Sequence, residues 1–142
     1  MKILNIVFVV LISFFIAGCN EEIKPSNANF KSIKGFDEIS QDKMTFLFLS
    51  KPGCKWCAKQ KEDFKNLEYI KKYPEYDFVK IESDEPLFKQ FYTSAFPISS
   101  FPTLVIMQRN EAQFIVVEKI EGYSKPEVLE SILEFNKDLV KK

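Results

Sequence analysis

Hydrophobic residues from position 30 onward gather into short runs that predict the strands of a sheet. The run MTFLFL at Met44–Leu49 is continuous and ends at the polar Ser50, which is typical of a strand buried on both faces. Three further strands are predicted: Tyr76–Ile81, Thr103–Met107 and Gln113–Ile120. A polar turn joins the last two, so we expect them to form an antiparallel hairpin.

Apolar residues at helical spacing predict a long helix between the first two strands. It extends from Cys57 to Tyr73 and ends before Pro74, which cannot continue a helix. Its expected apolar face consists of Trp56, Phe64, Leu67 and Ile70. Lysines and glutamates fill the positions between them, so the opposite face is expected to contact solvent.

Three shorter helical segments complete the pattern. Phe36–Gln41 precedes the first strand, and Leu87–Tyr92 follows the second, with Asp84 as its expected cap. The last helix begins after Ser124, which stands three residues before Glu127 in the pattern of a capping box. Its expected apolar face consists of Val128, Leu129, Ile132, Leu133, Asn136, Leu139 and Val140.

The order of these elements is βαβα, then a hairpin, then a helix, and it predicts an α/β domain. A β-α-β unit places its two strands parallel, whereas the two strands of a hairpin are antiparallel. The sequence therefore predicts a mixed sheet of four or five strands with helices on both faces, formed by residues 30–142.

The first residues of the chain read as a targeting segment. Ile3–Ile16 is nearly all apolar and follows Lys2. This run is shorter than the roughly 20 residues that a membrane span needs, and its length suits the hydrophobic region of a signal peptide. The alternative is an uncleaved N-terminal anchor helix.

The residues that follow favour cleavage and lipidation. Ile16-Ala17-Gly18-Cys19 resembles the bacterial lipobox, which implies removal of residues 1–18 and attachment of lipid to Cys19. Several acyl chains on one residue give stable membrane anchoring. Residues 19–29 are polar and are expected to form a flexible tether. We therefore expect an extracytoplasmic protein on the periplasmic side of a bacterial membrane. In enteric bacteria an aspartate directly after the lipidated cysteine favours retention in the inner membrane. This chain has Asn20 at that position, which favours the outer membrane.

Composition removes several classes of function. Lysine plus arginine equals aspartate plus glutamate at 20 each, so the charge balance does not favour nucleic-acid binding. The chain has no histidine, which excludes Cys/His zinc sites, imidazole copper sites and Ser-His or Cys-His nucleophile pairs. Of the three cysteines, lipidation of Cys19 leaves only Cys54 and Cys57.

The segment PGCKWCAKQ at Pro52–Gln60 places these two cysteines three positions apart at a predicted strand-to-helix junction. Such a CxxC pair fits a redox couple, half of a metal site or a structural disulfide. Residues at positions i and i+3 of a helical turn bring two Cα atoms within disulfide range, so the two sulfurs are able to bond to each other.

Other features around the CxxC pair reduce these alternatives. The pair follows the first buried strand and opens a helix, Phe101-Pro102 stands directly before the third strand, and Gly122 lies between the last strand and the last helix. Together these features resemble thioredoxin-fold proteins, specifically bacterial thioredoxin-like lipoproteins, over Phe30–Lys142. The resemblance implies a three-layer α/β/α sandwich, a cis peptide bond at Pro102 and thiol:disulfide oxidoreductase activity.

Three positions named here depart from thioredoxin itself, and a fourth matches it without its usual partner. Lys55 and Trp56 replace the Gly-Pro between its two cysteines, and Phe48 stands where thioredoxin keeps a buried aspartate for proton relay. Lys80 matches a thioredoxin lysine without its acidic partner, so it is either a solvated strand residue or a proton donor. Lys55 and the missing acid favour an oxidising pair, whereas many lipid-anchored relatives act as reductases.

The chemistry of disulfide exchange assigns different roles to the two cysteines, because one thiolate attacks and a second thiol resolves. Cys54 is expected at the helix N-terminus, where free N–H groups and the helix dipole lower its pKa. Lys51 and Lys55 add positive potential there. Cys57 lies one turn into the helix, so we expect Cys54 to be the nucleophile and Cys57 the resolving thiol.

Three further residues are candidates for contact with a substrate. Trp56 either packs in the fold or offers apolar area to a partner. Pro102 is expected to present the backbone of Phe101 for short β-pairing with an extended substrate.

Three hypotheses therefore stand for the activity. The first is a membrane-anchored thiol:disulfide oxidoreductase that acts on protein thiols or disulfides. We expect it to need no cofactor beyond the Cys54–Cys57 pair and to work as a monomer. A membrane redox donor is its expected partner for electron exchange. The second is a Cu(I) site in which Met44 and Met107 are the other soft ligands. The third is a redox-inert interaction domain, although a disulfide across so short a loop stabilises little.

Overall fold

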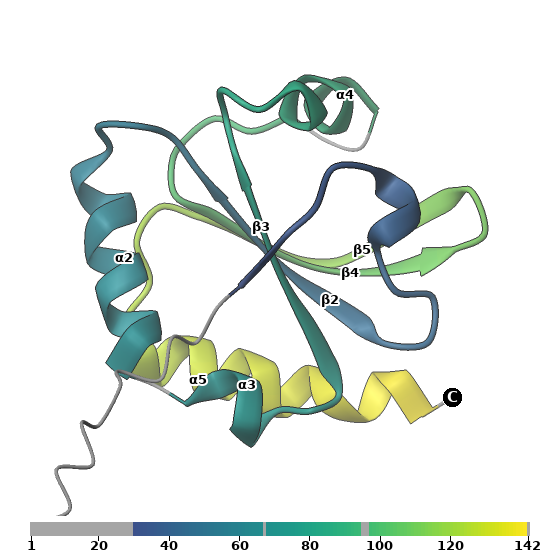
Figure 1. Cartoon of the computed structure of the whole chain (residues 1–142). Coiled ribbons are helices and arrows are strands. Elements are labelled where there is room, and N and C mark those ends of the chain that lie inside the picture. The colour runs from purple at the N-terminus through teal and green to yellow at the C-terminus, as the bar shows by residue number, and fades with distance from the viewer. Residues whose placement is uncertain (1–29, 67, 95–96, 142) are drawn as a thin grey trace, which may run out of the picture.

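The central feature of the structure is a mixed sheet of five strands with helices on both faces (Figure 1). The computed structural model describes residues 30–66, 68–94 and 97–141. The strands are β1 Lys31–Ser32, β2 Met44–Ser50, β3 Tyr76–Glu82, β4 Thr103–Asn110 and β5 Gln113–Glu121, in the spatial order β1-β3-β2-β4-β5. The helices are η1 Phe36–Glu38, α2 Lys55–Asn66, α3 Tyr69–Lys72, α4 Pro86–Ser94, α5 Pro126–Asn136 and η2 Lys137–Lys141.

The strand pairing confirms the predicted α/β fold. β3 is parallel to both β1 and β2, while β4 is antiparallel to β2 and forms the expected hairpin with β5. All four predicted strands are present, and each extends one to three residues further than the apolar run that predicts it. The sequence pattern misses β1, because its two residues are exposed and form no apolar run.

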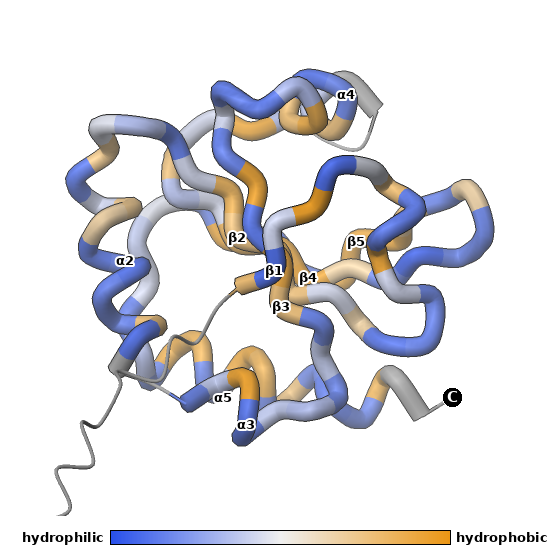
Figure 2. Tube along the Cα trace, in the orientation of Figure 1, coloured by the Kyte–Doolittle hydropathy of each residue, from blue (hydrophilic) through white to orange (hydrophobic). Residues whose placement is uncertain are grey.

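The sheet separates two hydrophobic clusters, which gives the predicted three-layer α/β/α sandwich. Figure 2 shows hydrophobic residues concentrated in the central strands. Alternate residues of β2, β3 and β4 point to opposite faces, as the pleat of a strand requires. The first cluster packs α2, α3 and α5 against one face of the sheet, and the second packs α4 against the other. Both faces are covered, which explains why β2 is a continuous apolar run rather than an alternating one.

Phenylalanine rings fill the first cluster beneath α2. The Phe30 ring lies 4.7 Å from that of Phe64 on α2 and 5.6 Å from that of Phe78 on β3. Phe64 also contacts the ring of Phe48 at 5.2 Å, nearly at a right angle. Edge-to-face pairs of this kind add about 0.5–1.5 kcal/mol each beyond the apolar area that they bury. These contacts fix the C-terminal half of α2 against the sheet.

The long helix predicted at Cys57–Tyr73 is wrong in being continuous, although its two ends lie within two residues of the observed ones. The structure has two helices there, α2 from Lys55 and a short α3, and residue 67 between them lies outside the described residues. The buried residues of α2 are Cys57, Gln60 and Phe64. Trp56 and Ile70, which were expected on the apolar face, are exposed. Tyr69 on α3 and Tyr73 directly after it cover the core instead, where α3 lies beside α5 (Figure 1).

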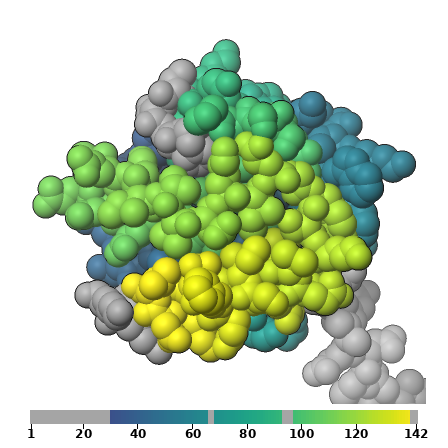
Figure 3. Space-filling view, turned by 180° about the vertical axis from the view of Figure 1, so that it is seen from behind, coloured from purple at the N-terminus to yellow at the C-terminus, as the bar shows by residue number. Residues whose placement is uncertain are grey.

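The capping box predicted at Ser124 is also wrong. α5 begins at Pro126, its N-cap is Lys125, and no side-chain hydrogen bond caps it. Proline at the first helical position explains the start, since its φ angle suits that position and it has no N–H to satisfy. Leu129, Leu133 and Asn136 form the buried face of α5, whereas Val128 and Leu139 are exposed. Seen from behind, α5 and β5 cover this side of the molecule (Figure 3).

The shorter helical predictions need smaller corrections. The segment predicted as a helix at Phe36–Gln41 forms only the single 3-10 turn η1. α4 begins at Pro86, so Asp84 lies one residue before the capping position. Among the described helices, none has the length and the apolar character needed to cross a lipid bilayer. The predicted signal peptide at 1–18, the lipidated Cys19 and the tether to residue 29 lie outside the described residues.

Candidate active site

A four-residue turn connects the sheet to the helix that carries the CxxC pair at its start. β2 ends at Ser50 and α2 begins at Lys55. The N–H of Cys54 donates to the carbonyl of Lys51 at 3.3 Å, which closes the turn. Gly53 adopts φ +72°, a conformation that side chains with a Cβ rarely take, so glycine suits this position. The turn places Cys54 directly before the first residue of α2, as expected.

The two cysteines form a disulfide in the structure, with their Cα atoms 5.2 Å apart. The backbone N–H of Cys57 donates to the sulfur of Cys54 at 3.1 Å. Cys54 is partly exposed, whereas only 2% of Cys57 is accessible to solvent. A free N–H group directed at the Cys54 sulfur stabilises a thiolate there, as does the N-terminus of α2. The arrangement therefore offers one reachable sulfur that accepts a backbone N–H and one shielded sulfur.

The Phe101–Pro102 segment lies beside this turn, and its peptide bond is cis, as the resemblance implied. The ammonium of Lys51 lies 5.6 Å from the centre of the Phe101 ring, which connects the CxxC turn to this segment. The carbonyl of Pro102 accepts a hydrogen bond from the N–H of Gly122 at 2.7 Å. Gly122 has φ +89°, so the turn after β5 favours glycine at this position.

Glu121 holds the loop that leads to Phe101 and Pro102. Its carboxylate accepts hydrogen bonds from the Ser99 hydroxyl, from the Ser99 N–H at 3.2 Å and from the Lys119 ammonium at 3.1 Å. These bonds, those from Ser99 first, lower the pKa of Glu121 to about 2. The carboxylate is therefore ionised at neutral pH and ties the loop to the end of β5.

Trp56 forms an exposed aromatic pair next to the disulfide. Its side chain is 54% exposed, and its ring lies 5.5 Å from that of Tyr123. The Lys59 ammonium lies 4.7 Å from the centre of the Tyr123 ring, and its hydrogen bond with Tyr123 raises the pKa of Lys59. Of the two readings left open for Trp56, core packing is wrong, and the exposed ring remains available for contact with a partner.

A hollow of about 430 Å³ opens beside the sulfurs and contains an ion pair that the sequence analysis missed. Lys61 donates to Glu82 at 2.7 Å, and this hydrogen bond is the main cause of the lowered pKa of Glu82. The hollow is lined by Lys51, Pro52, Gly53, Cys54, Lys55, Cys57, Ala58, Lys61 and Glu82. Two signals point to the pair: Lys61 lies one helical turn after Cys57, and the ends of parallel strands β2 and β3 meet at the same edge of the sheet.

Phe48 and Lys80 lie opposite each other in the register of β2 and β3. Phe48 is buried in the same cluster as Cys57, so an aromatic ring occupies the place of the family's buried acid. Lys80 is partly exposed and does not line the hollow beside the sulfurs. The structure therefore brings Lys51 and Lys55 to the cysteines and leaves Lys80 outside this group.

Gln60 joins the active-site helix to the turn after β5. It is fully buried, its amide donates to the carbonyl of Ser124 at 3.1 Å, and its carbonyl accepts from the N–H of Ser124 at 2.9 Å. Ser124 thus serves as a backbone partner for α2 rather than as a helix cap. Because Gly122 binds the carbonyl of Pro102, this contact indirectly connects α2 with the cis-proline segment.

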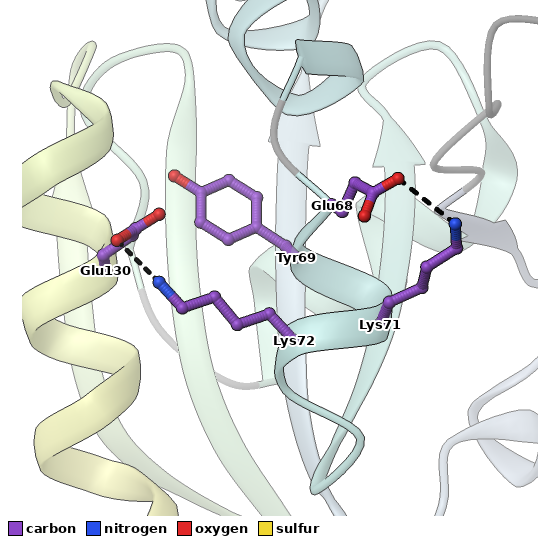
Figure 4. Close-up of a pocket in the computed structure, with 5 residues that line it drawn as sticks. All are labelled: Glu68, Tyr69, Lys71, Lys72 and Glu130. Atoms are coloured by element: carbon purple, nitrogen blue, oxygen red, sulfur yellow. Dashed lines mark hydrogen bonds and ion pairs between the residues drawn. The ribbon is translucent and has the colours of Figure 1, made fainter.

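A second hollow, of about 350 Å³, lies between α3 and α5 (Figure 4). Lys72 donates to Glu130 at 2.8 Å and Lys71 pairs with Glu68 at 3.2 Å. The hydroxyl of Tyr69 donates to the carbonyl of Pro126 at 3.3 Å, and burial raises the pKa of Tyr69. The charges here neutralise one another, so this hollow fits a structural contact between α3 and α5.

The geometry weighs against a copper site. Met44 stands at the start of β2, six residues before the end from which the CxxC turn leaves, a separation of roughly 20 Å along a strand. Met107 packs in the hydrophobic cluster on the other face of the sheet. Neither sulfur lies near the cysteines, and the part of the chain that the structure describes holds no cluster of three or more potential Cys, Asp or Glu ligands.

Comparison with known families agrees with this site. The family model of the thioredoxin-like domain matches residues 38–137, which include the CxxC pair and Pro102. The chain belongs to the thioredoxin-like family. A thioredoxin-like fold that carries the Cys54–Cys57 pair at disulfide distance supports thiol:disulfide oxidoreductase activity on protein thiols or disulfides.

Solved thioredoxins share the fold of this thioredoxin-like chain at low sequence identity. The thioredoxin of Trichomonas vaginalis is 14% identical, with a TM-score of 0.60 over 78% of this chain and 99% of the other. Oxidised thioredoxin from Plasmodium falciparum is 20% identical, with a TM-score of 0.58 over 77% and 99%. For mitochondrial thioredoxin 3 of Saccharomyces cerevisiae the values are 20% and 0.56 over 75% and 94%. A search of curated proteins by sequence finds no match.

Proposed function

We propose that this chain is a membrane-anchored thiol:disulfide oxidoreductase that works outside the cytoplasm of a bacterium. The observation that carries the chemistry is the state of the two sulfurs at the start of α2. Cys54 is partly exposed and accepts the N–H of Cys57, while Cys57 is buried and bonded to Cys54. This asymmetry supports Cys54 as the attacking nucleophile and Cys57 as the resolving thiol.

The reaction needs only these two sulfurs. In the reducing direction, the Cys54 thiolate attacks a substrate disulfide, the substrate S–S bond breaks, and one substrate sulfur leaves as a thiolate. Cys57 then loses its proton and attacks the Cys54 sulfur, which forms the Cys54–Cys57 bond and releases the second substrate thiolate. Two electrons thus pass to the substrate, and a membrane redox donor restores the dithiol. Oxidation of a substrate dithiol follows the same steps in reverse.

Two surfaces support the handling of a polypeptide substrate. Trp56 and Tyr123 offer apolar area on one side of Cys54. On the other side, the cis Phe101–Pro102 bond positions the backbone of Phe101 for pairing with an extended chain. Lys51 and Lys55 act on the pKa of Cys54 from the two ends of the turn, whereas the position of Lys80 favours a solvated strand residue.

The address rests on the sequence of the first 29 residues. The apolar run and the lipobox-like Ile16–Cys19 support cleavage after Gly18 and lipid attachment at Cys19, and Asn20 favours the outer membrane. Metabolic labelling with a radioactive fatty acid in a bacterial host tests this address. The wild-type chain takes up label and sediments with membranes, whereas Cys19→Ser takes up none. Equal labelling of both chains would contradict the lipid site.

Redox titration of the purified full-length chain against glutathione, together with insulin reduction, tests the activity. Cys54→Ser is expected to abolish exchange, and Cys57→Ser is expected to stop turnover and accumulate mixed disulfides on Cys54. Cys19→Ser is the matched control, since it removes a cysteine without touching the site, and it should retain full exchange in detergent. Tight Cu(I) binding by the wild-type chain, together with no disulfide exchange, would refute the proposed oxidoreductase activity.

A further inference from the structure

Positive charge is concentrated around the CxxC pair of a chain whose formal net charge is 0. Ser50–Lys61 contains four lysines and no acidic residue. Lys61 is neutralised by Glu82 at 2.7 Å, which leaves Lys51, Lys55 and Lys59. We call these three the lysine collar. Local charge of one sign on a nearly neutral protein points to a partner of the opposite sign.

The three lysines of the collar lie beside three different neighbours of Cys54. Lys51 lies over the Phe101 ring at 5.6 Å, Lys55 lines the hollow next to the sulfurs, and Lys59 lies over the Tyr123 ring at 4.7 Å. A substrate segment that reaches Cys54 between the aromatic pair and the cis-proline segment therefore passes within reach of all three ammonium groups.

The lysine collar remains available to a partner. Lys51 and Lys55 are exposed, and no described acidic residue forms an ion pair with either. The side chain of Lys59 is 49% exposed, and the described acidic residue that pairs with it, Asp63, is 3.9 Å away. The Asp63 side chain is 17% exposed, and the 3.9 Å separation is at the limit of an ion pair. Helical pairs of this i,i+4 kind contribute only about 0.3–0.5 kcal/mol, so the charge of Lys59 is weakly compensated.

We propose that the lysine collar selects substrates whose reactive cysteine is flanked by acidic residues. This inference rests on the proposed oxidoreductase function and specifies its substrate class. Carboxylates on the substrate attract the collar during encounter, and this accelerates formation of the mixed disulfide with Cys54. Substrates with lysines or arginines at the same positions are repelled and react more slowly.

Two peptide disulfides that differ only in flanking charge test the inference. Each is a symmetric disulfide of a short peptide with one cysteine and one phenylalanine, flanked by aspartates in one case and lysines in the other. The reduced full-length chain, in mild detergent, is mixed with each peptide, and the second-order rate constant is measured at low and high ionic strength. Three exposed lysines predict about a tenfold preference for the acidic peptide at low salt, which falls toward one near 1 M salt.

The triple variant Lys51→Gln, Lys55→Gln and Lys59→Gln separates docking from sulfur reactivity. A change in the pKa of Cys54 alters both rate constants equally, so it cancels from their ratio, and the ratio reports only discrimination between the peptides. The variant is expected to lose at least about threefold of the preference. A matched triple variant at exposed lysines away from the site, Lys34→Gln, Lys65→Gln and Lys71→Gln, has the same net charge and should keep it.

The possible results distinguish the inference from the function beneath it. Equal rates with both peptides, or equal loss of preference in both triple variants, would refute substrate selection by the lysine collar. Neither result would contradict the proposed oxidoreductase activity. Absence of exchange with either peptide refutes the oxidoreductase and the collar together. An acidic preference that salt and the collar variant both remove supports the proposal.

Discussion

Gln60 offers a direct test of how the active-site helix is held in place. Its side chain is fully buried and makes two hydrogen bonds with the backbone of Ser124, at 2.9 and 3.1 Å. Gln60→Met keeps a side chain of similar length and removes both bonds. The N–H and carbonyl of Ser124 then remain buried without these partners. Each such loss costs about 1–3 kcal/mol, so we expect the free energy of unfolding to fall by about 2–6 kcal/mol.

Urea denaturation of the oxidised chain, followed by circular dichroism, measures this loss. With a slope of about 2 kcal/mol per molar urea, the midpoint is expected to fall by about 1–3 M. Gln113→Met is the matched control, because Gln113 is exposed at the start of β5 and the same substitution there should change stability by less than about 0.5 kcal/mol. If Gln60→Met were as stable as this control, the two bonds would not fasten α2 to the turn after β5.

Three further predictions concern charge, ionisation and packing. Glu82→Gln leaves Lys61 uncompensated beside the sulfurs and should lower the pKa of Cys54, whereas Lys61→Gln should raise that pKa, each by about half to one pH unit. Alkylation rates of the reduced chain, measured against pH, report both shifts. Shifts in the same direction would contradict charge compensation. Burial raises the pKa of Tyr69 and Tyr76, so their contribution to stability is complete below the unfolded pKa near 10 and is lost as pH rises above that value. The tyrosinate absorbance of these two residues should therefore appear together with unfolding. Ionisation of both residues in an intact fold would refute this link between ionisation and stability. Phe64→Ala should lower the free energy of unfolding by about 3–5 kcal/mol, because Phe64 contacts Phe30 and Phe48. Thermal or urea denaturation measures this change, and a decrease of less than about 1 kcal/mol would contradict the packing.

The strands were predictable because their signal is local. The MTFLFL run identifies β2 whatever surrounds it, and the turn residues Pro52 and Gly53 mark its end. The position of Cys54 at the start of α2 follows from the same short segment. Two residues of β1 carry no such signal, since their strand character comes from pairing with β3.

The errors arise where distant contacts decide the local structure. Ser124 and Glu127 match a capping box, yet the backbone of Ser124 binds Gln60 on another helix, and Pro126 sets the start of α5. The pairing of Lys61 with Glu82 joins residues 21 positions apart across the edge of the sheet, so no single stretch of sequence shows it. Helical spacing also placed Trp56 on the buried face, although Cys57, its neighbour, occupies that face.

The chain contains a single tryptophan, Trp56, and it lies half-exposed between the two bonded cysteines. Disulfides quench indole emission at short range, so breaking the Cys54–Cys57 bond should brighten the intrinsic fluorescence of the protein. The molecule thus carries its own optical indicator of oxidation state. Its redox equilibrium with any candidate donor can be followed without a dye, a label or a coupled enzyme.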